Sequence, residues 1–304
     1  KKNIAVIGAG PAGLSFAVYA ADRGHQVKIF EASHQIGGQF NIAKKVPGKE
    51  EFYETLRYFS RQIELRPNIE LVLNHQATYE ELSQANFDEI VVATGVTPRQ
   101  LQFEGIDHPK VLSYLQVLKE RVPVGQRVAI IGAGGIGFDV SEFLLKPPHQ
   151  PQPQPLAEWQ REWGVDPNPD YISEGGTQRP EVEMPVRQIY LLQRKTTPLG
   201  IGLGKTSGWV HRAQLKKHAV RMLRGVQYKS VTDEGLWIEH NGHDQLLRVD
   251  TIVVCAGQES VKDLMPKEGE NTFAKYHIIG GAKLAAELDA KRAIRDGAEL
   301  AAKL

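Results

Sequence analysis

Two glycine-rich segments suggest the clearest chemistry in this 304-residue sequence. Each has the pattern G-x-G-x-x-G and lies between an apolar run typical of a buried strand and one typical of a helix. The first glycine allows a tight turn, the second lets the backbone approach a diphosphate, and the third lets the helix pack closely on the strand. Free N–H groups at the helix N-terminus then face the phosphates. Nucleotide contacts are therefore predicted for Gly8, Gly10, Pro11, Ala12 and Gly13, and for Gly132, Gly134, Gly135, Ile136 and Gly137.

The residues that follow the two loops favour different nucleotides. Glu31 ends the strand after the first loop, 18 residues beyond Gly13 (31 − 13). A carboxylate there accepts hydrogen bonds from ribose hydroxyls and repels a 2′-phosphate, which suits FAD. After the second loop the corresponding strand runs into Arg194 and Lys195. Two cations suit the 2′-phosphate of NADPH. The alternative interpretation is a solvated basic strand end.

Other small or polar residues extend these two predicted sites. Ile36–Gln39 follows Glu31 closely and is interpreted as a second backbone approach to FAD, through Gly38 and Gln39. Two strands end in small-residue turns that are predicted to be the crossings between domains. The residues assigned to the cofactor sites from these segments and from the turn before the last helix are Ala93, Thr94, Gly95, Ala256, Gly257, Gly280 and Gly281. Lys205 is predicted to lie near the phosphates of the nicotinamide cofactor.

Several other chemistries are disfavoured. The single cysteine, Cys255, excludes a dithiol reductase and an iron–sulfur cluster held by this chain alone, and it favours a reducing compartment such as the cytoplasm. Residues 200–207 resemble a phosphate-binding loop, but Leu199 stands where the first glycine is required. The ten histidines show no metal-ligand spacing, so no metal site is predicted. No catalytic side chain is assigned, because the cofactors themselves carry hydride chemistry.

The net charge of +1 and the absence of a long apolar run argue against nucleic-acid and membrane partners. The expected fold class is α/β, with two Rossmann-like nucleotide-binding domains. The NAD(P)H domain, residues 99–256, is expected to be inserted into a discontinuous FAD domain, residues 1–98 and 257–304. Nine prolines mark residues 147–185 as an insertion, with one helix expected near 156–163.

The remaining elements follow from periodicity and turn residues. An amphipathic helix is expected over 51–65, and a last helix over 284–303. Residues 229–240 and 246–249 are expected to form two antiparallel strands joined by a turn at Asn241–Gly242. Cys255 falls in an apolar run and is expected to be a buried, unreactive strand residue.

Taken together, the two glycine loops, Glu31 and the Ala93–Gly95 turn resemble the two-domain FAD/NAD(P)H flavoprotein reductases. Longer strings are similar to the bacterial NADPH-dependent 2,4-dienoyl-CoA reductases, which belong to the NADH:flavin oxidoreductase and trimethylamine dehydrogenase-like family. These strings are residues 132–139, 162–164, 192–195, 203–209, 255–258, 279–281 and 287–290.

This resemblance implies that the chain is the C-terminal part of a longer enzyme. Members of that family have an N-terminal (β/α)8 barrel with FMN and the acyl-CoA site, and a 4Fe-4S cluster that links the barrel to the flavin domain. By analogy, NADPH reduces FAD in this chain, and electrons then pass through the cluster to FMN, which reduces a 2,4-dienoyl-CoA of unsaturated fatty acid β-oxidation.

One position departs from the wider flavoprotein pattern, which has Gly-Asp before the last helix. Here the pair is Gly280–Gly281, so the carboxylate that would bond the ribityl chain of the flavin is missing. Weak FAD retention by the isolated chain is therefore expected. Two alternatives remain open on the sequence, namely a self-sufficient NAD(P)H:acceptor reductase and a non-enzymatic flavin-binding module.

Overall fold

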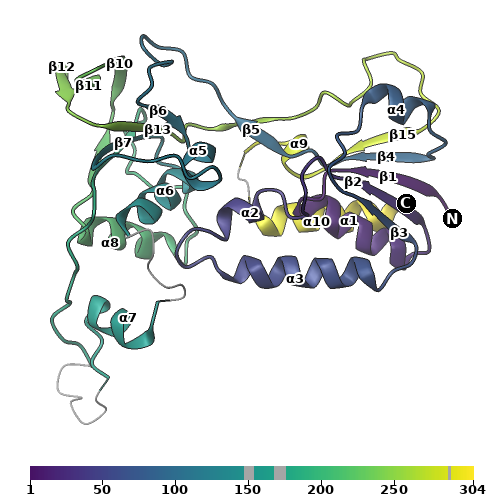
Figure 1. The fold of residues 1–304 in the computed structure, drawn as a ribbon, viewed down its shortest axis with the longest axis horizontal. Helices are drawn as coiled ribbons and strands as arrows, with labels where there is room; N and C mark the ends of the chain where they lie inside the picture. Colours follow the sequence, from purple (N-terminus) through teal and green to yellow (C-terminus); the bar gives the residue numbers. More distant parts are fainter. Residues whose placement is uncertain (147–153, 168–175, 287–288) are drawn as a thin grey trace. The chain divides into compact units, whose positions relative to one another are not determined.

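The computed structural model describes residues 1–146, 154–167, 176–286 and 289–304 (Figure 1). The chain divides into two compact units. Unit 1 contains residues 1–44, 51–99 and 258–304, and unit 2 contains residues 45–50 and 100–257. The short segment 45–50 therefore belongs by its contacts to unit 2, although the helices before and after it belong to unit 1.

Unit 1 is built on a five-stranded parallel sheet with the order β15-β4-β1-β2-β3. The bounds of these strands, in chain order, are β1 Asn3–Ile7, β2 Gln26–Phe30, β3 Ile69–Val72, β4 Glu89–Val92 and β15 Lys275–Ile278. Alternate strand residues face opposite layers, so Ile4 and Val6 pack in one hydrophobic cluster and Ala5 and Ile7 in the other.

Helices cover both faces of this sheet (Figure 1). One layer consists of α1 Pro11–Asp22, α3 Glu51–Glu64 and α10 Ala290–Lys303. The buried face of α3 carries Leu56, Phe59 and Ile63, as its helical spacing predicts. The other layer contains α4 Tyr79–Gln84. Smaller elements are α2 Phe40–Ala43, α9 Gly280–Lys283 and an antiparallel pair of β5 Val96–Pro98 with β14 Gln258–Ser260.

Unit 2 repeats this plan with the parallel order β6-β13-β7-β8-β9. The bounds are β6 Val111–Ser113, β7 Arg127–Ile131, β8 Gln188–Gln193, β9 Arg221–Arg224 and β13 Thr251–Val254. Its helices are α5 Tyr114–Leu118, α6 Gly135–Leu145, α7 Leu156–Trp163 and α8 Gly208–Lys217. In each unit, the strand that leads into a glycine loop is the central strand of its sheet. The α/β class with Rossmann-like parallel sheets is therefore confirmed.

Two element predictions were wrong. Residues 229–240 do not form one strand, because the chain reverses at Asp233–Glu234 and continues with Gly235 at φ 142°. The result is a three-stranded antiparallel sheet of β10 Gln227–Thr232, β11 Gly235–His240 and β12 His243–Leu247.

The last helix begins at Ala290 and not at 284, because Asp289 caps it by accepting a hydrogen bond from the Arg292 N–H at 2.5 Å. The helix predicted inside the proline-rich insertion is present as α7. Most of the prolines around it, and the 287–288 part of the family resemblance, lie outside the described residues.

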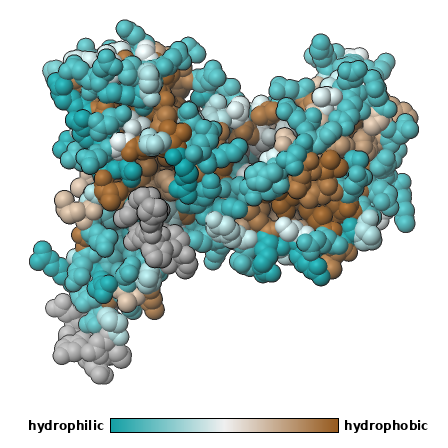
Figure 2. All heavy atoms as spheres, in the orientation of Figure 1, coloured by the Kyte–Doolittle hydropathy of each residue, from teal (hydrophilic) through white to brown (hydrophobic). Residues whose placement is uncertain are grey.

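Hydrophilic residues cover much of the face seen in Figure 2. Among the helices of the described residues, none is long and apolar enough to cross a membrane.

Candidate functional site

The first glycine loop is a tight turn whose shape depends on glycine at two of its three positions. Gly8 has φ 106° and donates its N–H to the Phe30 carbonyl oxygen at 2.8 Å. A methyl group on Gly13 would overlap the carbonyl oxygen of Gly8. Gly10 differs, because a methyl group there would meet no atom within 4 Å and its φ is −77°. The fold of the chain by itself therefore does not require glycine at position 10.

Glu31 lies beside this loop. Its Oε2 accepts the Ala9 N–H at 2.8 Å, and its Oε1 accepts the N–H and the hydroxyl of Ser33 at 2.9 and 2.7 Å. The carboxylate thus braces the loop, a role that its position at the end of β2 did not reveal. Carboxylate oxygens have further lone pairs, so these bonds leave acceptor capacity for a ribose hydroxyl.

The other residues predicted to bind FAD gather around the same loop in unit 1. The Gly37 N–H donates to the Ala9 carbonyl oxygen at 2.7 Å, and a methyl group on Gly38 would lie 3.1 Å from the Gly10 Cα. Gln39 is the residue before α2. Gly8 also lies against the Ala93 carbonyl group. The adjacent Thr94 hydroxyl donates to the Val261 carbonyl oxygen at 2.7 Å.

The Gly280–Gly281 turn completes this cluster and explains the missing aspartate. A Cβ on Gly280 would lie 2.8 Å from the Ala12 Cβ, so the turn is close to the first turn of α1. A Cβ on Gly281 would lie 2.9 Å from Val96 Cγ1 and 3.4 Å from the Gly95 backbone. An aspartate at position 281 would therefore require Val96 to move.

The second glycine loop has the same geometry in unit 2. Gly132 has φ 108° and donates its N–H to the Leu192 carbonyl oxygen at 2.9 Å. A methyl group on Gly137 would overlap the Gly132 carbonyl oxygen, whereas Gly134 and Gly135 have no atom within 4 Å of such a group.

The strand end after β13 lies against this second loop. A Cβ on Gly132 would be 2.7 Å from the Cys255 carbonyl oxygen and 3.0 Å from the Ala256 Cα. The neighbouring Gly257 has φ 91°. The Cys255 side chain is buried, and burial raises the pKa of its thiol. This agrees with the prediction of an unreactive residue, although Cys255 follows β13 and is not part of it.

Cationic side chains gather where β8 and β9 end. Arg194 and Lys195 follow β8 and are exposed, and their side chains make no hydrogen bond or ion pair within the described part of the chain. The Gly225 N–H donates to the Lys195 carbonyl oxygen at 3.0 Å, and Gln193 is paired with Arg224 in the parallel register. Arg224 is thus a third exposed cation at this edge. Sequence reasoning missed it, because its only signal was an arginine at the end of a strand that had not been predicted.

Lys205 lies in the exposed loop between β8 and α8. Two contacts at Gly200 hold this loop in place. The Phe138 ring of α6 packs against Gly200, and the Arg212 guanidinium donates to the Gly200 carbonyl oxygen at 3.0 Å. His211 Nδ1 lies 2.7 Å from Glu142 Oε1. The hydrogen bond with Glu142 raises the pKa of His211. His211 therefore joins α8 to α6, a role that the sequence did not suggest.

An ion pair near the start of α6 was also not foreseen. Lys49 Nζ lies 2.7 and 2.6 Å from the two carboxylate oxygens of Asp139. Lys49 belongs to the segment 45–50, and this ion pair joins that segment to α6 within unit 2. Among the described residues, no cluster of three or more histidine, cysteine or acidic side chains has a geometry that could hold a metal ion.

Comparison with known proteins assigns the family. The profile of the pyridine nucleotide-disulphide oxidoreductase family matches residues 2–279. The chain belongs to this family. Members of the family typically bind FAD and NAD(P)H. The chain is thus a member of an oxidoreductase family and is related to flavin-dependent reductases.

Three of the similar proteins are considerably longer than this chain. A metal reductase of Desulforamulus reducens is 31% identical over 277 residues, which are 86% of this chain and 38% of that protein. A cinnamate reductase of Clostridium sporogenes is 28% identical and is matched over 92% of this chain and 36% of its own length. A structure of 2-naphthoyl-CoA reductase with 2-naphthoyl-CoA has a TM-score of 0.79 and is 26% identical. The match covers 100% of this chain and 40% of the 2-naphthoyl-CoA reductase chain. Thioredoxin reductase of T. acidophilum shares the fold, with a TM-score of 0.66 at 14% identity.

Proposed function

We propose that this chain is the electron-input part of a larger flavoprotein reductase of the 2,4-dienoyl-CoA reductase type. In this proposal, unit 1 binds FAD and unit 2 binds NADPH, and hydride passes from NADPH to FAD. The electrons then leave towards an FMN and iron–sulfur barrel outside this sequence, where the dienoyl-CoA is reduced. The chain spans only about two fifths of the length of its relatives, which supports a partial reaction for the region described.

The observation that carries the proposal is the unfilled space at the middle glycine of both loops. Gly13 and Gly137 are glycine because the fold itself leaves no room for a side chain. Gly10, Gly134 and Gly135 have room for a methyl group. Packing therefore does not explain why these three residues are glycines. Close backbone approach to a cofactor diphosphate supplies that reason at both loops.

The assignment of the two cofactors follows from charge. Glu31 lies against the first loop and disfavours a 2′-phosphate there. Arg194, Lys195 and Arg224 lie together at the ends of β8 and β9, next to the strand that leads into the second loop. Three cations without an anionic partner in the described residues suit the two negative charges of a 2′-phosphate.

When bound, the cofactors supply the hydride chemistry, and the residues of this chain bind and orient them. The N–H groups at the start of α1 and α6 bind the diphosphates, and Glu31 fixes the shape of the first loop. The long strings shared with 2,4-dienoyl-CoA reductases support a dienoyl-CoA as the final acceptor. The single, unpaired Cys255 supports a cytoplasmic location.

Anaerobic mixing of the FAD-loaded chain with NADPH tests the proposal. FAD absorbance should bleach rapidly, and NADH should react more slowly. Neutral replacements of Arg194 and Lys195 should weaken NADPH far more than NADH, whereas an equal loss for both would remove the 2′-phosphate assignment. Reduction of a dienoyl-CoA by this chain alone would contradict the partial role.

A further inference from the structure

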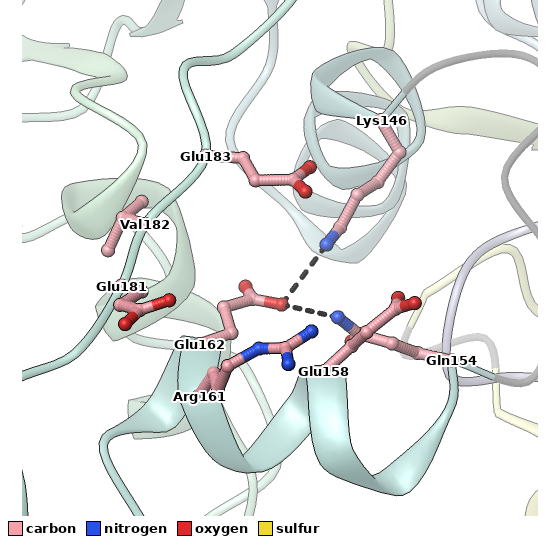
Figure 3. Close-up of a pocket in the computed structure, with 8 residues that line it drawn as sticks. All are labelled: Lys146, Gln154, Glu158, Arg161, Glu162, Glu181, Val182 and Glu183. Carbon is pink, nitrogen blue, oxygen red and sulfur yellow. Dashed lines mark hydrogen bonds and ion pairs between the residues drawn. The ribbon is translucent and has the colours of Figure 1, made fainter.

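The helix inside the insertion, α7, contacts the rest of unit 2 mainly through polar groups. Glu162 is the only buried residue of α7, and its apolar Leu156 and Trp159 are 68% and 43% exposed. Most of the surface around this helix is hydrophilic on the face seen in Figure 2. The Glu162 side chain is 8% exposed, and its carboxylate lies between Lys146 and Gln154 beside a cavity of about 340 Å³ (Figure 3).

Donors from the ends of α6 and α8 and from the residues before α7 converge on this carboxylate. Oε2 accepts from Lys146 at 3.2 Å and from Gln154 at 2.9 Å (Figure 3). Oε1 accepts from Gln214 at 2.7 Å and lies 3.3 Å from Lys217 Nζ. Burial raises the pKa of Glu162, but the two glutamine hydrogen bonds and the two lysine charges outweigh it and bring the pKa to about 2. Glu162 is therefore ionised at neutral pH.

The two lysines lie at the C-terminal ends of α6 and α8. Lys146 is the residue after α6, and Lys217 is the last residue of α8. Both lysine side chains are largely buried, at 16% and 14% exposure, and both ammonium groups are paired with Glu162. Lys217 also lies 3.8 Å from the Trp163 ring centre. Without the Glu162 charge, the two ammonium groups would repel each other across a partly buried site.

The opposite ends of the same two helices border the proposed nicotinamide site. The second glycine loop leads into α6, and the loop that carries Lys205 leads into α8. The two helices are joined between these ends by the contact of His211 with Glu142. Movement of their C-terminal ends would therefore be transmitted to the loops.

We infer that Glu162 is a positioning residue for the nicotinamide cofactor, because it holds together the far ends of the two helices that carry the cofactor-binding loops. This inference rests on the proposed function of unit 2. It assigns the insertion a role in cofactor affinity, although none of the described insertion residues is predicted to touch the cofactor.

Glu162→Gln tests the inference, and Glu158→Gln is the matched control. Glu158 lines the same cavity from the same helix, and its side chain has no hydrogen bond or ion pair within the described residues. The binding of NADP⁺ to the FAD-loaded chain is measured by calorimetry, and hydrogen exchange of the α8 amides is measured without NADP⁺. Glu162→Gln should accelerate that exchange and raise the Kd for NADP⁺ roughly tenfold, or about 1.4 kcal/mol, with unchanged FAD content. Glu158→Gln should change neither.

Adding Lys146→Gln to the Glu162→Gln variant tests whether the loss of affinity comes from repulsion between the two lysines or from a change in side-chain packing. This second change removes one of the two facing ammonium groups, so it should restore much of the NADP⁺ affinity. The inference would be overturned if Glu162→Gln left the Kd for NADP⁺ or the α8 hydrogen exchange unchanged. It would also be overturned if the double variant did not recover NADP⁺ affinity. Neither result would contradict the proposed function. If the wild-type chain binds no NADP⁺, the proposed function and the inference fail together.

Discussion

Replacement of Gly10 by alanine tests whether a glycine is needed at this position for ligand binding or for the fold. A methyl group at position 10 meets no atom within 4 Å, and the φ of −77° is one that alanine adopts freely. The variant should therefore fold normally. Its stability should even rise by about 0.4–1 kcal/mol, because alanine restricts the unfolded chain more than glycine does.

FAD binding should respond in the opposite direction. If the FAD diphosphate approaches the backbone at Gly10, the added methyl group meets it, and overpacking of this kind costs about 1–3 kcal/mol. That cost corresponds to a Kd for FAD raised roughly 5- to 150-fold. The assays are urea unfolding of the chain without cofactor and fluorescence titration of the same protein with FAD.

Two results would refute this reasoning about Gly10. A Gly10→Ala variant that binds FAD as tightly as the wild type would show that no ligand approaches the backbone there. A variant that loses stability without cofactor would show that Gly10 serves the fold, contrary to the open space around it.

The remaining predictions concern the second loop, the packing glycine and a histidine. Gly134→Ala should weaken NADP⁺ binding in calorimetry and leave FAD content unchanged. Gly13→Ala should lower the free energy of unfolding in urea by about 1–3 kcal/mol, because its methyl group overlaps the carbonyl oxygen of Gly8. The pKa of His211 is raised in the folded chain, so its pairing with Glu142 stabilises the fold. This stabilisation is fully present below about pH 6.5, the ordinary pKa of histidine, and is lost as the pH rises through the raised pKa of the folded state. NMR titration should show that Glu142→Gln lowers the pKa of His211.

Each of these predictions has a clear contrary result. Loss of FAD together with NADP⁺ in Gly134→Ala would mean that the two loops do not serve separate cofactors. Unchanged stability in Gly13→Ala would mean that α1 can shift from its strand without cost. If Glu142→Gln left the pKa of His211 unchanged, the hydrogen bond between His211 and Glu142 would not be the cause of the raised pKa.

Much of the α/β fold was predictable because its signals are local. A buried strand, a G-x-G-x-x-G turn and an apolar helix are encoded within about 20 consecutive residues, and both copies form as expected. The helix at 156–163 and the amphipathic α3 also follow from local spacing. The hairpin of β10 and β11 was missed because Asp233–Glu234 is a weak turn signal without its partner strand.

The sequence by itself determined that there are two glycine-rich loops of the Rossmann type, and it identified the charged residues that follow each loop. Only the tertiary structure decided which distant residues meet at those loops. The pairing of β8 with β9 brings Arg224 beside the end of β8, and the packing of α7 brings Glu162 to Lys146 and Lys217. Such contacts depend on strand register and helix packing summed over the whole unit, and no short stretch of sequence encodes them. The open space at Gly10 is likewise a property of the folded chain, and it shows that packing requires a glycine at position 13 but not at position 10.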